Sequence, residues 1–251
     1  MHDDLVRTVV VTGGSRGIGA DITRAFSAAG WRVVIGSRSE PDFADGHDIV
    51  FIPTDVRQPE SLEALASQTV ESCGRLDAWV NCAGFSAWRS IGEVDEGFWD
   101  DMLDTNLKGT FFGCKAAAAR LGPGGAIVNI SSLAGRRGSA NNSVYCASKF
   151  GVTAVTQSLA KELGVQGIRV NAVCPVYVQT EGLLEALADQ SSPVSGGDVA
   201  AYLAQFAAEQ SSLKRLPLGE EVAAAVLWLA SEGSSAVTGQ SLNVDCGVMP
   251  I

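Results

Sequence analysis

The sequence contains few of the residues that build the commonest catalytic triads and metal centres. Only two of its 251 residues are histidine, His2 and His47, and both lie in polar stretches that we expect at the surface. The six cysteines include no Cys-x-x-Cys pair. We therefore expect no histidine-based triad, no metal site and no disulfide framework.

Long apolar runs and an excess of positive charge are also missing. No stretch approaches the ~18 consecutive apolar residues of a membrane-spanning helix, and residues 1–4 lack the basic start of a signal peptide. We therefore expect a soluble, cytoplasmic protein without a membrane partner. The net charge of −10 argues against a nucleic-acid partner, because binding to a phosphate backbone requires a basic surface.

The sequence does contain a regular alternation of short β-branched runs and longer helical patterns. Strands are predicted at residues 8–12, 32–36, 49–53, 77–81, 126–130, 168–173 and 241–244, and helices at 17–29, 59–71 and 144–163. Continuous apolar strands separated by helices predict an α/β fold with one doubly wound parallel sheet of about seven strands. No linker or repeat interrupts the chain, so we expect residues 1–251 to form a single domain.

Residues 176–215 break this alternation and carry Ser, Pro and Gly near their middle. One interpretation is a surface insertion. The interpretation that we prefer is a mobile lid over a pocket, because long segments of this kind in compact domains are often lids.

The first predicted strand runs into a glycine-rich turn, TGGSRGIG at residues 12–19. Gly13, Gly17 and Gly19 lie between a strand and a helix, where glycine permits a tight turn and a close approach of the backbone to a pyrophosphate. The helix that follows offers free N–H groups to phosphate oxygens. The turn therefore predicts a dinucleotide site, although its glycine spacing differs from the common G-x-G-x-x-G.

The end of the second predicted strand bears on the choice of nucleotide. A site for NAD usually has an acidic residue there, which binds the ribose 2′-hydroxyl. Here the strand ends in Ser37 and Arg38, and Arg16 lies in the glycine turn. Two guanidinium groups suit a 2′-phosphate, so the sequence favours NADP(H) over NAD(H). The alternative is that both arginines are solvated surface residues.

Tyr145, Lys149 and Ser132 form the candidate catalytic set. A phenol has a pKa of about 10, and an ammonium group one helical turn away favours the phenolate. A serine hydroxyl from a separate segment is suited to hold a carbonyl oxygen beside that phenol. The three residues predict a proton donor and acceptor that works near neutral pH.

From Thr8 to Gly247, these motifs resemble the short-chain dehydrogenase/reductase family in order and spacing, nearest its 3-oxoacyl carrier-protein reductase and sugar or alcohol dehydrogenase branches. The resemblance implies a Rossmann fold and adds Asn106 to Ser132, Tyr145 and Lys149 as a catalytic tetrad. The motifs and the resemblance together predict a cofactor site formed by Gly13, Ser15, Arg16, Gly17, Ile18, Gly19, Ser37, Arg38, Asp55, Val56, Asn81, Ala83, Gly84, Tyr145, Lys149, Pro175, Val178 and Thr180.

The resemblance also implies a reaction, hydride transfer between the nicotinamide and a small carbonyl or alcohol substrate. Tyr145 would exchange the proton, Ser132 would position the oxygen, and Lys149 would lower the pKa of Tyr145 and bind the nicotinamide ribose. Asn106 would hold a water that links Lys149 to solvent. A thioester, a hydroxy-ketone, a sugar and a polyketide all stay open as substrates. The alternatives are an NAD-dependent alcohol or sugar dehydrogenase and a non-catalytic NADP-binding sensor.

The family pattern also implies a homotetramer, or a homodimer, that pairs helices around residues 107–120 and 149–163. Three positions depart from the pattern. Cys82 replaces the second Asn of the Asn-Asn-Ala-Gly motif, Val176 replaces a glycine beside the nicotinamide, and Cys246 replaces a glycine near the C-terminus. We expect Val176 to narrow the pocket, because its branched side chain adds bulk and stiffness. Cys246 is expected to be ordinary packing rather than a redox group.

Overall fold

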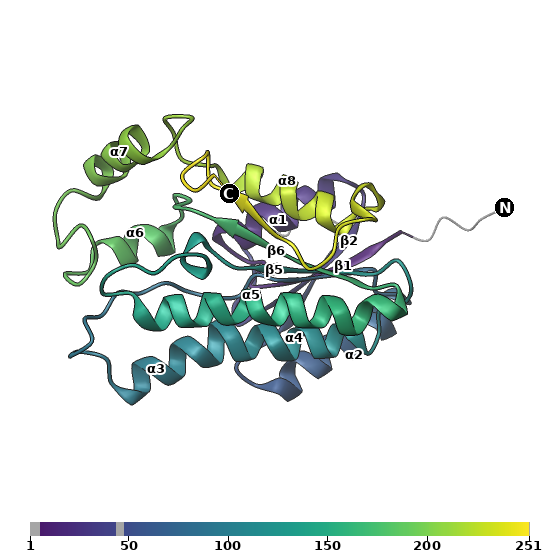
Figure 1. Ribbon diagram of the computed structural model, residues 1–251. Helices are drawn as coiled ribbons and strands as arrows, with labels where there is room; N and C mark the ends of the chain where they lie inside the picture. Colours follow the sequence, from purple (N-terminus) through teal and green to yellow (C-terminus); the bar gives the residue numbers. More distant parts are fainter. Residues whose placement is uncertain (1–5, 44–47, 251) are drawn as a thin grey trace.

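The computed structural model describes residues 6–43 and 48–250, with a seven-stranded sheet at its centre (Figure 1). The strands are β1 (Thr8–Thr12), β2 (Arg32–Ser37), β3 (Ile49–Pro53), β4 (Ala78–Asn81), β5 (Ala126–Ile130), β6 (Arg169–Pro175) and β7 (Ser241–Val244). All neighbouring strands are parallel, in the order β3-β2-β1-β4-β5-β6-β7. The predicted doubly wound sheet is therefore confirmed. Ligands bind in such sheets beyond the carboxyl ends of the strands, where the order reverses between β1 and β4.

Helices cover both faces of the sheet (Figure 1). They are α1 (Gly17–Ala28), α2 (Pro59–Cys73), α3 (Glu96–Leu103), α4 (Gly109–Ala118), α5 (Ser143–Leu163), α6 (Glu181–Leu187), α7 (Val199–Gln210) and α8 (Gly219–Ala230). Successive strand residues point to opposite faces. Val9 and Val11 accordingly pack with α1 and α8, whereas Val10 packs with α2, α4 and α5. This two-sided burial explains why the strands are continuously apolar.

Helix α4 approaches the sheet closely because glycine lies on its inner face. A Cβ at Gly109 would lie 3.0 Å from the Cβ of Val56, and a Cβ at Gly113 would collide with the side-chain oxygen of Asn81. The helix lies within the range 107–120 expected from the family resemblance.

Helices α3 and α8 are not among the elements predicted from sequence patterns. Helix α3 has only Met102 as a buried residue, so it shows no apolar stripe. Helix α8 is apolar over most of its surface, which hides the helical period. The remaining boundaries differ from prediction by small shifts; β6, for example, continues to Pro175.

Residues 176–215 do break the alternation, as predicted, but they contain α6 and α7 rather than an open loop. These helices pack around a separate apolar cluster that includes Trp88, Leu187 and Leu203. An ion pair of 3.2 Å between Arg89 and Asp189 ties the segment to the loop that follows β4. The insertion is therefore confirmed, and its mobility stays a prediction.

No helix among residues 6–43 and 48–250 is long and apolar enough to cross a membrane. The two histidines lie outside these described ranges, so their expected surface position stays a prediction. All six cysteines are free, as expected. No cluster of three or more potential metal ligands occurs among the described residues.

Candidate active site

A cavity of about 1200 Å³ lies where the glycine turn and the loops after β4, β5 and β6 meet. Except for Asn81 and Asn106, every residue predicted for the catalytic and cofactor sites lines this cavity. The structure therefore brings together segments that lie more than 160 residues apart in the sequence, from Gly13 to Thr180. Its lining includes both the glycine turn and the pair of Ser132 and Tyr145.

The glycine turn needs glycine for two separate reasons. Gly13 has φ +67°, and a Cβ there would lie 2.7 Å from the Cα of Ala83. A Cβ at Gly19 would collide with the carbonyl oxygen of Gly13. The turn thus packs against the loop after β4 and leaves the N-terminus of α1 without a side-chain cap. Free N–H groups at such a helix end are suited to a pyrophosphate.

The wall beyond β2 and β3 carries charges of both signs. Arg16 and Arg38 are exposed on the cavity wall, and neither forms an ion pair with another residue of the described chain. Asp55, by contrast, is paired with Arg57 at 2.7 Å, and hydrogen bonds from Arg57 lower the pKa of the Asp55 carboxyl. Two unpaired guanidinium groups fit a phosphate better than a neutral hydroxyl.

Glu40 and Asp42 also line this cavity. Sequence reasoning missed both, because they lie beyond the strand end at which an acidic residue is usually sought.

Asn81 lies behind the cavity and not on its wall. Its side chain donates to Asn129 at 2.9 Å and accepts from the indole of Trp79 at 2.8 Å. The hydroxyl of Thr12 accepts from the backbone N–H groups of Cys82 and Ala83. These bonds fix the loop after β4, so Asn81 supports the site from within the sheet.

The predicted catalytic residues do converge. Ser132 follows β5, whereas Tyr145 and Lys149 occupy the first two turns of α5. Ser132 and Tyr145 both line the cavity, and the Ser132 side chain acts to lower the pKa of the Tyr145 hydroxyl. The Lys149 amine donates to the carbonyl oxygen of Ile130 at 2.9 Å and lies 5.8 Å from the centre of the Tyr145 ring. The hydroxyl groups of Ser132 and Tyr145 and the amine of Lys149 therefore line the same cavity.

Burial dominates the acid–base properties of this set. It raises the pKa of Tyr145 to about 12, and the Ser132 side chain acts in the opposite direction. Burial also lowers the pKa of Lys149 to about 8. Loss of hydration dominates the pKa of Tyr145, and the Lys149 amine is directed at the Ile130 carbonyl, so the expected lowering of this pKa by Lys149 stays a prediction.

Asn106 is fully buried in a π-helical turn, Asp104–Lys108, between α3 and α4. Its amide nitrogen donates to the carbonyl oxygen of Phe85 at 2.9 Å and to the hydroxyl of Ser148 at 3.2 Å, and its oxygen accepts from the Phe85 N–H at 3.0 Å. A Cβ at Gly84 would lie 2.9 Å from this oxygen and 3.6 Å from the Lys149 amine. Asn106 thus joins the loop after β4 to α5, directly behind Lys149. Single π-helical turns are frequent at functional sites.

Sequence reasoning missed the aromatic wall of the cavity, which we define as Trp88, Tyr177 and Phe206. The rings of Tyr177 and Phe206 are 4.9 Å apart at 66°. The three residues come from the loop after β4, the segment after β6 and α7, and no motif marks them. Tyr177 directly follows the Pro175-Val176 pair that the sequence did single out, and Val176 also lines the cavity.

The chain matches a described protein family over nearly its full length. Residues 13–249 match the family described as enoyl-(acyl carrier protein) reductase. The chain is 35% identical to a short chain dehydrogenase/reductase of Aspergillus oryzae, over 96% of this chain and 94% of that protein. It is 34% identical to glucose 1-dehydrogenase 2 of Bacillus subtilis, over 99% and 97%.

A solved structure shows the same fold and also carries a nucleotide. A variant of actinorhodin polyketide ketoreductase with NADPH superposes with a TM-score of 0.88 at 32% identity, covering 97% of each chain. Fold, site and relatives together define an oxidoreductase that uses a nicotinamide cofactor. The chain belongs to the short-chain dehydrogenase/reductase family.

Proposed function

We propose that this protein is an NADP(H)-dependent oxidoreductase that interconverts a carbonyl compound and its secondary alcohol. The pair of Ser132 and Tyr145 carries the proposal, because both residues lie with Lys149 in the cavity that also holds the glycine turn. The alternative of a non-catalytic sensor explains the glycine turn but gives no reason for this pair.

The residues of the cavity fit a dinucleotide. Bound NADP(H) would supply or accept the hydride. The glycine turn and the N-terminus of α1 would bind the pyrophosphate, and Arg16 and Arg38 would bind the 2′-phosphate. Thr180 caps α6 and also lies against Gly17, since its Cγ2 would be 3.3 Å from a Cβ placed there. Thr180 therefore connects the glycine turn to the insertion of residues 176–215.

The proton would move through groups that the chain itself supplies. The Tyr145 hydroxyl donates to the substrate oxygen during reduction, and Ser132 holds that oxygen by a hydrogen bond. Lys149, with its pKa near 8, gains and loses a proton close to neutral pH and would replace the one that Tyr145 gives up. Asn106 holds the loop behind Lys149 and would position a water there.

The proposal is tested by following nicotinamide absorbance with NADPH and with NADH against a panel of ketones, and with the oxidised cofactors against alcohols. Turnover of at least one carbonyl compound with NADPH is the expected result. Binding of NADPH without turnover of any panel member would instead support the sensor.

An NAD-dependent sugar or alcohol dehydrogenase is the second candidate. Glu40 and Asp42 on the cavity wall favour it, because carboxylates suit a ribose hydroxyl better than a phosphate. Glucose turnover with NAD in the same assay would select this candidate.

The side chain of Val176 is expected to limit the size of the substrate. Val176 lies between Pro175 and Tyr177 on the cavity wall and is half-buried. Val176→Gly should admit bulkier ketones and leave the kcat/KM of small ketones changed by less than about twofold, because only space is added. Identical profiles across a ketone series in both proteins would mean that the valine does not face the substrate.

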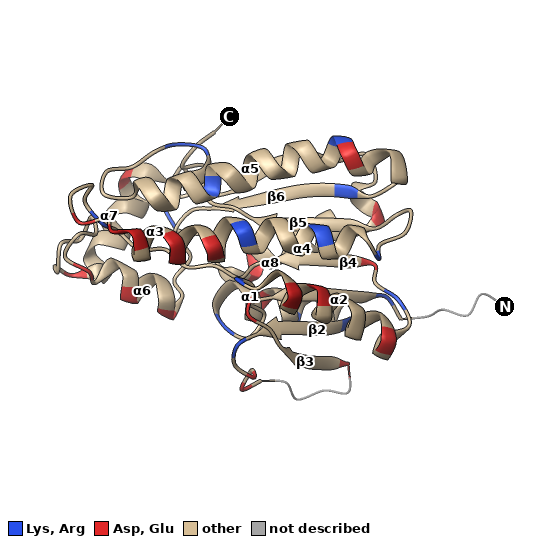
Figure 2. Cartoon of the chain, turned by 90° about the horizontal axis from the view of Figure 1, so that it is seen from below, with Lys and Arg blue, Asp and Glu red and all other residues tan. Residues whose placement is uncertain are grey.

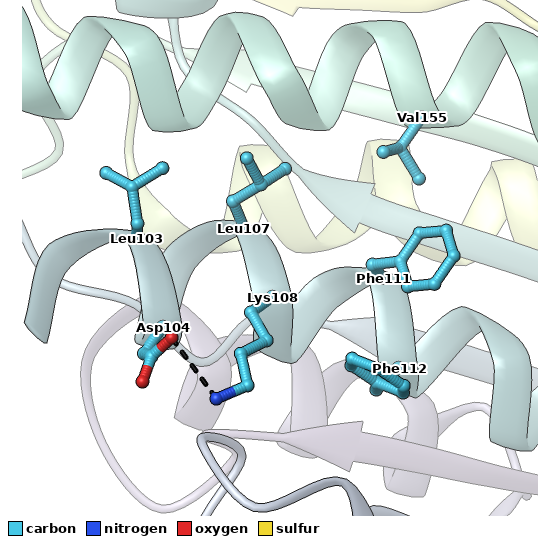
Figure 3. Close-up of a pocket in the computed structure, with 7 residues that line it drawn as sticks. All are labelled: Leu103, Asp104, Leu107, Lys108, Phe111, Phe112 and Val155. Carbon is cyan, nitrogen blue, oxygen red and sulfur yellow. Dashed lines mark ion pairs between the residues drawn. The ribbon is translucent and has the colours of Figure 1, made fainter. Parts of the chain in front are cut away.

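The outer face of α4 and α5 is the surface that we propose for self-association. A shallow apolar hollow of about 400 Å³ lies there, lined by residues that include Leu107, Phe111 and Val155 (Figure 3). Phe111 and Phe150 are 42% and 46% exposed. Val152, on the same helix, is fully buried against the body of the protein. A second copy of the chain would cover the exposed rings in a homotetramer or homodimer.

Light scattering at micromolar concentration should give the mass of a tetramer or dimer. Phe111→Glu should shift that mass towards the monomer, because it places a charge in an apolar contact. Val165→Glu is the matched control, since Val165 is 90% exposed outside this hollow. A monomeric mass for the unmodified protein would contradict the assembly.

A further inference from the structure

Three arginines lie close in sequence to the loops of the catalytic residues, and they differ in the partners that their side chains have in the structure. Arg89 is paired with Asp189 at 3.2 Å. Arg136 donates to the carbonyl oxygen of Ser241 at 2.9 Å. Arg137 lines the cavity together with Tyr145, and its guanidinium forms no hydrogen bond or ion pair within the described parts of the chain. Arg137 is therefore the arginine of this group that remains available to a ligand.

Arg137 lies on the side of the cavity formed by the aromatic wall. Burial raises the pKa of Tyr177, and so does its hydrogen bond with Tyr202, whereas the positive charge of Arg137 acts to lower it. Tyr177 also interacts electrostatically with Tyr145. The tyrosine of the wall thus lies within electrostatic reach of both Arg137 and the catalytic phenol.

The aromatic wall offers surface for an apolar body and few polar contacts. Trp88 is 4% exposed, and Leu183 and Val176 continue the apolar lining. The hydroxyl of Tyr177 is 3.3 Å from that of Tyr202, so it is already engaged. A neutral sugar needs many hydrogen bonds, whereas a planar ring is well matched to aromatic side chains.

The surroundings of the cavity are acidic. Asp and Glu residues occur on α3 and α6, at the end of the molecule that holds the insertion (Figure 2). The chain as a whole carries a charge of −10, so its overall field does not attract anions. Arg137 is an exposed, unpaired arginine on the cavity wall, and it would act on an anion at short range through hydrogen bonds.

We propose that Arg137 binds an anionic group of the substrate while the aromatic wall holds its apolar body, so that the substrate is an anionic ring-bearing ketone. The inference rests on the proposed oxidoreductase function. The anionic oxygens belong either to a carboxylate on the ketone or to the phosphates of a coenzyme A thioester. Arg137 is then a residue that determines specificity and takes no part in proton transfer.

The test compares ketones that differ only in charge. With NADPH, we expect the kcat/KM for 4-acetylbenzoate to exceed that for its methyl ester by about tenfold, as for one charge-assisted hydrogen bond. Arg137→Gln should erase this preference by raising KM for the acid at nearly constant kcat, and should leave the ester unchanged. Lys161→Gln is the matched control, because it removes the same charge from an exposed position outside the cavity.

The phosphate source is tested with acetoacetyl-coenzyme A and the uncharged N-acetylcysteamine thioester of acetoacetate. If Arg137→Gln lowers the kcat/KM only for the coenzyme A thioester, Arg137 binds the phosphates of that substrate. The aromatic wall is tested with Phe206→Ala. This variant should lower the kcat/KM for 4-acetylbenzoate and for its methyl ester by similar factors, and lower the kcat/KM for 5-oxohexanoate by a smaller factor.

The possible failures are distinguishable. If the unmodified protein reduces neutral ketones but shows no preference for either charged partner, or keeps that preference in Arg137→Gln, the inference is overturned and the proposed function stands. If the unmodified protein reduces no ketone or thioester with either cofactor, the proposed function itself fails.

Discussion

Tyr145→Phe is expected to remove nearly all turnover while cofactor binding is retained. The substitution keeps the ring and deletes the hydroxyl that lies with Ser132 in the cavity. General acid catalysis by a positioned side chain contributes about 10²–10⁴-fold, so the rate should fall by about that factor. Steady-state rates with the best ketone of the panel, together with a fluorescence titration of NADPH, measure both effects.

Tyr202→Phe is the matched control for this experiment. It also removes a phenolic hydroxyl, but from α7 and from a residue that does not line the cavity. The control should keep more than about half of the rate, since its hydroxyl contacts only another side chain within the fold. If Tyr145→Phe kept more than a tenth of the normal rate, another group would have to be the acid.

The second large effect concerns the choice of cofactor. We expect NADPH to bind more than about tenfold more tightly than NADH, because charge-assisted hydrogen bonds from Arg16 and Arg38 contribute about 1.5–3 kcal/mol. In the double variant Arg16→Gln/Arg38→Gln, the dissociation constants of NADPH and NADH should become similar, chiefly because NADPH binds more weakly. Titration of each protein with both reduced cofactors measures the change.

Arg24→Gln serves as the control for the double variant. Arg24 is exposed on α1, the helix that follows the glycine turn, but it is paired with Asp21 and does not line the cavity. Its removal should leave the ratio of the two constants unchanged. Equal binding of NADPH and NADH by the unmodified protein would mean that Glu40 and Asp42 offset the two arginines.

The sequence predicts those parts of the site in which the role of each residue depends only on its neighbours within one short segment. The glycine turn is one example, because Gly13 and Gly19 are dictated by the backbone of that turn and its immediate contacts. The spacing of Tyr145 and Lys149 is another, because one helical turn sets both side chains on the same face. Such signals survive without knowledge of the rest of the fold.

The remaining parts depend on tertiary contacts that no local pattern encodes. Arg89, Arg136 and Arg137 look alike in the sequence, and only their partners in space distinguish them. The aromatic wall is assembled from three distant segments. The raised pKa of Tyr145 likewise follows from burial, which the spacing to Lys149 does not reveal.

The π-helical turn at Asp104–Lys108 also sets the relative phase of the two helices that it joins. A helix advances by about 100° for each residue, so one additional residue in a turn rotates everything beyond it by that angle. Asn106 faces the protein interior within this turn, while the glycine face of α4 meets the sheet. Deleting one residue here would give a smoother helix and would be expected to swing Gly109 and Gly113 away from the sheet. The extra residue thus sets the rotation of α4 relative to α3. One continuous helical segment can therefore direct the polar side chain of Asn106 into the protein and still place the glycines of α4 against the sheet.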